Sequence, residues 1–74
     1  MRPASLPHTA LDEHLVHRVR AEFLEMPGLR LTPQQASRLW ALDRATSELV
    51  LDRLASTGFL SRTHEGAYLR ASAA

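Results

Sequence analysis

The sequence of 74 residues predicts a single small α+β domain in the order helix, strand, helix, helix, strand, strand. Apolar residues recur at three- and four-residue steps through the first two thirds of the chain, which is typical of amphipathic helices. Two alternating runs on either side of "HEG" near the C-terminus predict a β-hairpin. A chain of this length buries only about 60% of the surface that it exposes when unfolded, so we expect one compact core.

The first helix is expected over about residues 10–26. Its apolar positions are Leu11, Leu15, Val19 and Phe23, joined by Val16 and Leu24. Thr9 followed by Asp12 is a plausible N-terminal cap, and Pro27-Gly28 ends the helix. Residues 1–9 contain two prolines and no apolar period. This composition predicts a flexible N-terminal arm.

A short strand and a second helix are expected next. The alternation of apolar and polar residues over 29–31 suits a short strand against a core. Thr32 then precedes Pro33 and Gln35, so its hydroxyl can accept from the third helical amide while Gln35 reaches back. The second helix is expected from Pro33 to about Trp40. We expect it to bury Ala36, Leu39 and Trp40.

The third helix is expected over about residues 44–57, with Asp43 as its N-cap because aspartate favours caps over helix interiors. At 100° per residue the helix has two distinct faces. The inward face is Ser47, Val50, Leu51 and Leu54, and the outward face is Ala45, Glu48, Leu49 and Asp52.

A β-hairpin is expected after Gly58, which supplies the left-handed residue that ends the third helix. Residues 59–63 and 67–70 form the two strands, joined by a three-residue turn that contains a glycine. Because a lone hairpin is only marginally stable, we expect it to add residues 29–31 as a third strand and to lay Phe59 and Tyr68 against the helices. Residues 71–74 are expected to fray.

The run from Thr32 to Gly58, followed at once by an apolar pair and a hairpin, resembles the winged helix-turn-helix domain of bacterial transcription regulators. The resemblance covers about residues 10–70, and the pattern "L-x-x-L-x-x-x-G-F-L" from Leu51 to Leu60 is similar to the family's junction between recognition helix and wing. It implies a DNA-binding, transcription-regulatory module in which the third helix reads DNA and the hairpin is the wing. Ala41 stands where the family often has glycine, which predicts a slightly different turn.

Double-stranded DNA is the partner that the resemblance implies. Duplex binding needs cations that neutralise phosphates and side chains that reach base edges. Arg44 is the best placed for a guanine edge, and Glu48 could accept from a cytosine amino group. Taken singly, each arginine is more simply a solvated side chain or a surface ion pair worth about 0–1 kcal/mol. The candidate DNA-binding residues are Gln34, Arg38, Arg44, Thr46, Glu48, Arg53, Arg62 and His64.

Protein docking is the alternative, because the outward face of the third helix is acidic and apolar where DNA-reading members commonly carry hydroxyl, amide or basic residues. Its candidate residues are Ala45, Glu48, Leu49 and Asp52. Leu49 could anchor a partner, although isolated exposed leucines are common. An accessory subunit whose partner supplies both charge and activity is a third alternative. A homodimer through the first helix is also open if Val16 and Leu24 form a second apolar edge; otherwise both are core.

Several other classes of function find no support in the sequence. The net charge is only +1 and all nine basic residues are arginines, so any nucleic-acid site must be a local patch. Cysteine is absent, and His14 and His17 lack a third convergent ligand, so we expect no cofactor and no metal. Nothing resembles a nucleophile elbow or a phosphate-cradling loop, so no enzyme activity is expected. Without a long apolar run or a secretory signal, we expect a cytoplasmic protein that does not enter membranes.

Overall fold

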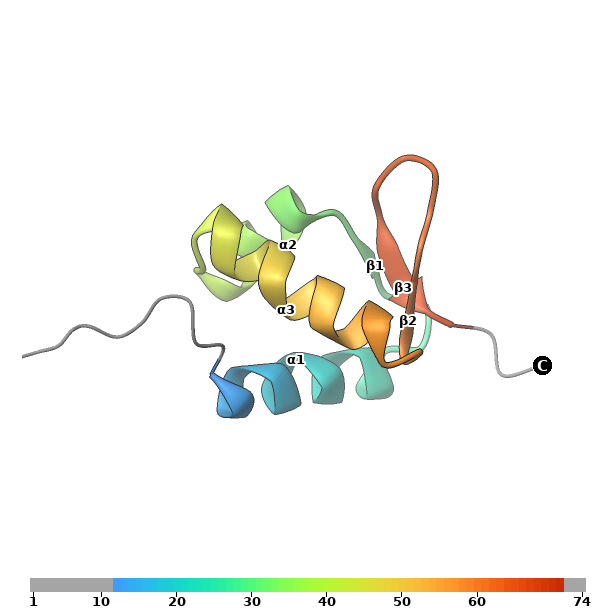
Figure 1. Cartoon of the computed structure of the whole chain (residues 1–74), viewed down its shortest axis with the longest axis horizontal. Helices are drawn as coiled ribbons and strands as arrows, with labels where there is room; N and C mark the ends of the chain where they lie inside the picture. The colour runs from blue at the N-terminus through green and yellow to red at the C-terminus, as the bar shows by residue number, and fades with distance from the viewer. Residues whose placement is uncertain (1–11, 72–74) are drawn as a thin grey trace, which may run out of the picture.

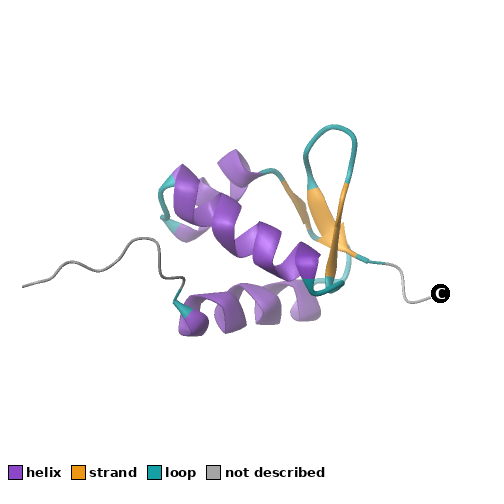
Figure 2. Cartoon of the chain, viewed as in Figure 1, coloured by secondary structure: helices purple, strands orange, loops and turns teal. Residues whose placement is uncertain are grey.

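The computed structural model of the protein describes residues 12–71. They form an α+β domain in the expected order (Figures 1 and 2). The elements are α1 (Glu13–Glu25), β1 (Arg30–Leu31), α2 (Pro33–Trp40), α3 (Arg44–Ser56), β2 (Leu60–Arg62) and β3 (Tyr68–Arg70). The expected arm of residues 1–9 lies outside the described residues. None of the helices within residues 12–71 is long and apolar enough to cross a membrane.

The start of α1 differs from the expectation of about residue 10. The Asp12 side chain accepts a hydrogen bond from the backbone amide of His14 at 3.0 Å, so Asp12 itself is the N-cap and the helix begins at Glu13. Such a cap satisfies one of the amides that has no partner within the helix. The alternative cap residue, Thr9, lies outside the described residues.

The caps of α2 and α3 are those that the sequence predicts. At α2, Thr32 Oγ1 accepts from the Gln35 amide at 3.2 Å, while the Thr32 amide donates to Gln35 Oε1 at 2.9 Å. At α3, the Asp43 carboxylate accepts from the Thr46 amide at 3.3 Å. Hydrogen bonding by the Thr46 side chain, together with nearby backbone amides, lowers the pKa of Asp43. Both helix starts are therefore fixed by local side-chain chemistry.

The turn between α2 and α3 contains Ala41 in the left-handed conformation, with φ 55° and ψ 45°. This is the backbone conformation that glycine adopts most readily. An L-residue adopts this conformation at a cost of about 1–2 kcal/mol, because its Cβ crowds the following carbonyl. The amide of Leu42 donates to the Ser37 carbonyl at 3.0 Å across the same turn.

The sheet is antiparallel with strand order β1-β3-β2, so β1 is the expected third strand. In the hairpin, the Thr63 amide donates to the Ala67 carbonyl at 2.8 Å, and the Gly66 amide donates to the Thr63 carbonyl at 3.0 Å. Gly66 has φ 87°, as the left-handed position of a three-residue hairpin turn requires. The loop of the hairpin projects away from α1 (Figure 1).

The core lies where α1, α2, α3 and the sheet meet. Its buried members are Val16, Val19, Phe23, Leu31, Ala36, Trp40, Val50, Leu51, Leu54, Leu60 and Tyr68, with Phe59 packed against them. The inward face predicted for α3 is confirmed, and Ser47 is buried with it. Phe23 and Trp40 meet edge to face, with ring centroids 6.3 Å apart. Aromatic contacts of this kind join the first two helices.

Two apolar positions differ from the sequence prediction. Leu39 is 55% exposed, because the short helix α2 buries the side that carries Ala36 and Trp40 and turns Leu39 to solvent. On α1, Val16 belongs to the core while Leu24 is 45% exposed, so the two do not form one shared apolar edge.

A candidate binding surface between α3 and the hairpin

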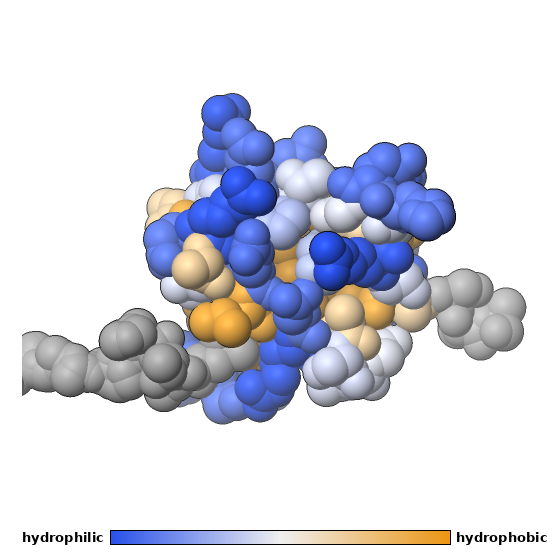
Figure 3. All heavy atoms as spheres, turned by 45° about the horizontal axis from the view of Figure 1, so that its top comes forward, coloured by the Kyte–Doolittle hydropathy of each residue, from blue (hydrophilic) through white to orange (hydrophobic). Residues whose placement is uncertain are grey.

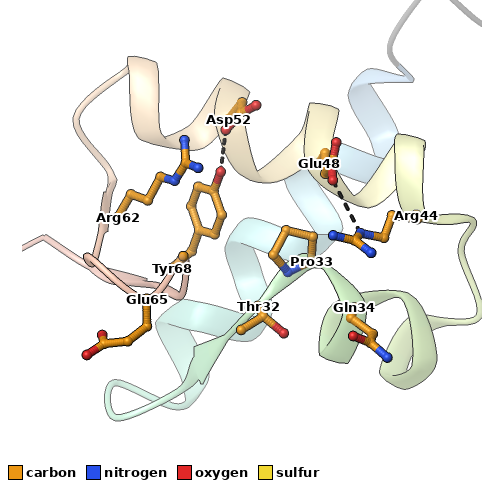
Figure 4. Close-up of a pocket in the computed structure, with 10 residues that line it drawn as sticks. Thr32, Pro33, Gln34, Arg44, Glu48, Asp52, Arg62, Glu65 and Tyr68 are labelled. Carbon is orange, nitrogen blue, oxygen red and sulfur yellow. Dashed lines mark hydrogen bonds and ion pairs between the residues drawn. The ribbon is translucent and has the colours of Figure 1, made fainter.

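An open concavity of ≈ 390 Å³ lies between the outward side of α3, the start of α2 and the β2–β3 hairpin (Figure 4). We call it the α3–hairpin concavity. Its lining residues are Thr32, Pro33, Gln34, Arg44, Glu48, Asp52, Arg62, Glu65, Gly66 and Tyr68. Three segments that are separate in sequence therefore share one surface.

The α3 side of the concavity is a stripe of charged residues at four-residue intervals: Arg44, Glu48 and Asp52. Residues spaced in this way lie one above another on a helix surface. Arg44 Nε donates a hydrogen bond to Glu48 Oε2 at 3.3 Å. The Arg44 side chain nevertheless stays 65% exposed. It is available to a partner that enters the concavity.

The hairpin side is tied to α3 by Tyr68, whose hydroxyl donates to Asp52 Oδ1. Tyr68 is buried, and burial, followed by the hydrogen bond to Asp52, raises its pKa to about 12. Arg62 is the cross-strand partner of Tyr68, with its guanidinium 5.8 Å from the ring centroid (Figure 4). This contact is within the range of a cation–π interaction.

The charges of the concavity are mixed. Glu48, Asp52 and Glu65 supply carboxylates, and Arg44 and Arg62 supply guanidinium groups, so carboxylates outnumber cations by one. Glu65 also lies 4.0 Å from the guanidinium of Arg30. The visible surface in Figure 3 is largely hydrophilic, with apolar residues in separate spots between polar ones. Any partner must therefore satisfy charges of both signs.

The structure brings together only part of the predicted DNA-binding set. Gln34, Arg44, Glu48 and Arg62 all line the α3–hairpin concavity. Arg38, Thr46 and His64 do not line it; Arg38 and His64 are exposed on α2 and in the hairpin turn, and Thr46 is half-buried in the first turn of α3.

Arg53 lies apart from the other candidates. Its guanidinium forms an ion pair with Glu13 of α1, on the other flank of α3. That flank borders a second hollow of ≈ 510 Å³, a groove between α1, the end of α3 and Phe59. Arg53 is thus placed to hold α1 against α3.

The predicted docking set is divided in the same way. Glu48 and Asp52 line the concavity, whereas Ala45 and Leu49 are exposed outside its lining, with Leu49 45% exposed. The outward side of α3 therefore has a charged stripe that faces the hairpin and a small apolar crest beside it.

Sequence reasoning missed five lining residues: Thr32, Pro33, Glu65, Gly66 and Tyr68. Glu65 follows His64 in the hairpin turn, so the sequence alone indicates that a carboxylate lies beside this candidate residue. The contact between Tyr68 and Asp52 spans sixteen residues and depends on how the hairpin packs on α3. No local pattern signals such a contact.

Comparison with known proteins adds no assignment: no protein-family model, curated protein or solved structure matches the chain.

Proposed function

We propose that the protein binds double-stranded DNA at the α3–hairpin concavity, as a small cytoplasmic transcription-regulatory module of the winged helix-turn-helix type. The observation that supports this proposal is the convergence of Gln34, Arg44 and Arg62, from three different elements, on one open surface. Amide and guanidinium groups are the side chains that most often contact base edges and phosphates.

The proposed complex places α3 in the major groove, which is wide enough to admit a helix. Arg44 is the first residue of α3, and helix-turn-helix proteins contact bases with the N-terminal residues of the recognition helix. The exposed side chains of Arg62 and His64 lie on the hairpin, and Arg38 lies on α2. These three residues would contact phosphates on either side of the groove.

The carboxylates of the concavity limit the strength of this binding. Glu48, Asp52 and Glu65 repel phosphates, so we expect no more than the roughly two or three phosphate contacts that Arg38, Arg62 and His64 can make. For that number the logarithm of affinity falls with the logarithm of salt concentration with a slope of about −2 to −3. Affinity for mixed-sequence DNA should then lie in the non-specific range, with a Kd of roughly 10⁻⁴ to 10⁻⁶ M.

The test is a titration of the full chain with a labelled mixed-sequence duplex, followed by fluorescence anisotropy at about 20 to 150 mM salt. Binding should weaken with the stated slope, and NMR shifts should change at Arg44, Thr46, Arg62 and His64. The double variant Glu48→Gln with Asp52→Asn should bind more tightly, because two repelling charges are removed. The matched control is Glu22→Gln with Glu25→Gln, which removes the same charge from α1, outside the concavity.

Two results would contradict the proposal. The first is no binding at the lowest salt concentration. The second is an equal gain in affinity from the α1 control, which would mean that net charge alone governs binding and that α3 is not the contact surface.

Docking of a protein partner is the second candidate, favoured by the exposure of Leu49 beside Ala45 and between charged residues. A photo-reactive residue at position 49 should form one saturable crosslinked adduct with the purified partner. The same residue at position 25 on α1 should form none. Leu49→Asp should then prevent binding of the purified partner with the stability of the domain unchanged, because Leu49 is outside the core. Binding by Leu49→Asp at wild-type strength would reject this candidate.

A further inference from the structure

We propose that Arg44, held in place by Glu48, contacts a guanine, so that the protein prefers DNA with a guanine at one fixed position of its site. This inference rests on the proposed DNA binding and deepens it by naming the base. Glu48 acts as a positioning residue, because it contacts the arginine and not the DNA.

The geometry of the pair leaves the reading end of the arginine free. Arg44 Nε donates to Glu48 Oε2 at 3.3 Å, and no other hydrogen bond or ion pair of Arg44 is found within residues 12–71. Its guanidinium is directed into the concavity, with Glu48 to one side and Pro33 of α2 nearby (Figure 4). The two terminal amino groups therefore remain available. Their fork matches the O6 and N7 acceptors that guanine presents in the major groove.

Helix stability does not account for this arrangement. Arg44 begins α3, at the positive end of the helix dipole, where a cation is unfavourable. The order of the pair, arginine before glutamate, is also the less favourable one for an i,i+4 ion pair. Exposed pairs of this kind contribute little to folding in any case. Fixing the direction of the guanidinium is a role that fits the observed contact.

Glu48 has two opposing effects on a DNA complex. Its charge repels phosphates and lowers affinity for every sequence. Its hydrogen bond restricts the many conformations of the arginine side chain, so less entropy is lost when the guanidinium contacts a base. Specificity is a difference between affinities, and a residue can raise it while lowering affinity as a whole. Variants of Glu48 can separate the two effects.

The first experiment measures base preference directly. The full chain selects from a library of duplexes with randomised central positions, and the bound fraction is sequenced. Wild type should enrich guanine at one position by roughly 5- to 100-fold, the range of a good bidentate contact. Arg44→Lys keeps the charge but replaces the planar fork by a single ammonium group, so it should reduce the enrichment and retain the salt dependence. Arg18→Lys, on the exposed surface of α1 outside the concavity, is the control and should keep it.

The second experiment tests the contact and its support. Replacing the selected guanine by 7-deazaguanine removes the N7 acceptor, and should weaken binding by wild type several-fold and binding by Arg44→Lys less. Glu48→Asp keeps the charge but is one methylene shorter, so guanine preference should fall without a change in salt dependence. Glu48→Gln keeps the reach and the acceptor, so it should bind all sequences more tightly and retain part of the preference.

The outcomes distinguish this inference from the function on which it rests. Salt-dependent binding without a preferred guanine, or a preference in Arg44→Lys equal to that of wild type, overturns the inference and leaves the proposed function standing. A guanine preference unchanged in Glu48→Asp rejects the positioning role of Glu48. Absence of DNA binding at the lowest salt overturns both.

Discussion

The two flanks of α3 use the same residue types in different ways. On the α1 flank, Arg53 pairs with Glu13 across two helices, at a groove that is also lined by the buried residues Val16 and Leu54. On the hairpin flank, Arg44 pairs with Glu48 within one helix, over an open polar concavity. The Arg53–Glu13 pair connects two helices that the core already holds together. The Arg44–Glu48 pair connects no two elements, and it leaves the guanidinium of Arg44 exposed to solvent.

The difference shows how a small domain can separate stability from binding. Burial of apolar side chains on the inward side of α3 stabilises the fold, so the hairpin flank is free to carry charges that contribute little to it. The tie between Tyr68 and Asp52 is the exception, because it connects a buried ring to the concavity. Substitutions on the inward side and the α1 flank should therefore change the free energy of unfolding, and substitutions on the hairpin flank should change binding.

The largest effect is expected from Leu51→Ala, since Leu51 is fully buried on the inward side of α3. Loss of its side chain should lower the free energy of unfolding by about 3 kcal/mol, through lost burial and the cavity that remains. Leu49→Ala, on the exposed crest, should change it by less than about 0.5 kcal/mol. Urea unfolding followed by circular dichroism measures both. Equal losses would mean that the rotational setting of α3 is wrong.

Alkaline pH should weaken the fold through Tyr68. Its pKa is about 12 in the folded protein against 10.0 ordinarily, so the folded state holds this proton more tightly than the unfolded state. The resulting stability is fully present below pH 10.0 and is lost as the pH rises toward 12. The loss should reach about 2 kcal/mol.

Absorbance of tyrosinate can follow this titration, because Tyr68 is the sole tyrosine and the chain has neither lysine nor cysteine. Tyr68→Phe should remove the loss of stability above pH 10.0. If Tyr68 titrates near pH 10.0 in the folded protein, its side chain is not buried and hydrogen-bonded to Asp52 as described.

A gain in stability is expected from Ser47→Ala. The Ser47 hydroxyl is buried, and its oxygen has no hydrogen-bond partner within residues 12–71. Removing an unsatisfied buried hydroxyl should raise the free energy of unfolding by about 1 kcal/mol. Ser56→Ala is the control, because the exposed Ser56 hydroxyl donates to the Arg53 carbonyl at 2.9 Å. Thermal unfolding of both variants should show a gain for Ser47→Ala alone.

The smallest changes in stability are expected from substitution of the two paired arginines, Arg53 and Arg44. Arg53→Gln should lower the free energy of unfolding by no more than about 0.5 kcal/mol and leave DNA affinity almost unchanged. Arg44→Gln should leave stability unchanged and weaken DNA binding. Parallel urea and anisotropy titrations measure the pair. The reverse assignment would show that the α1 flank is the binding surface.

The sequence predicts the fold well because the signals that define it are local. The capping box at Thr32, the cap at Asp43 and the glycine of the hairpin turn each depend on residues within a few positions, and the structure confirms them. The prediction that Leu39 is buried is wrong, because a helix as short as α2 has too few apolar residues to define one inward direction.

The candidate site was harder to predict because it depends on contacts between distant segments. Nothing near Arg53 in the sequence indicates that Glu13, forty residues away, neutralises it. The same holds for Tyr68 and Asp52, which meet only when the hairpin packs on α3. The pairing of Arg44 with Glu48 is an i,i+4 contact, and could have been predicted by taking the two residues together.

The left-handed alanine between α2 and α3 is a position at which the stability of the domain can be increased. Ala41→Gly would relieve a methyl group from an unfavourable backbone angle at an exposed position that borders neither hollow. A higher melting temperature for this variant would provide a more tolerant background. Charge reversals and other damaging substitutions on the concave surface could then be studied in a protein that stays folded.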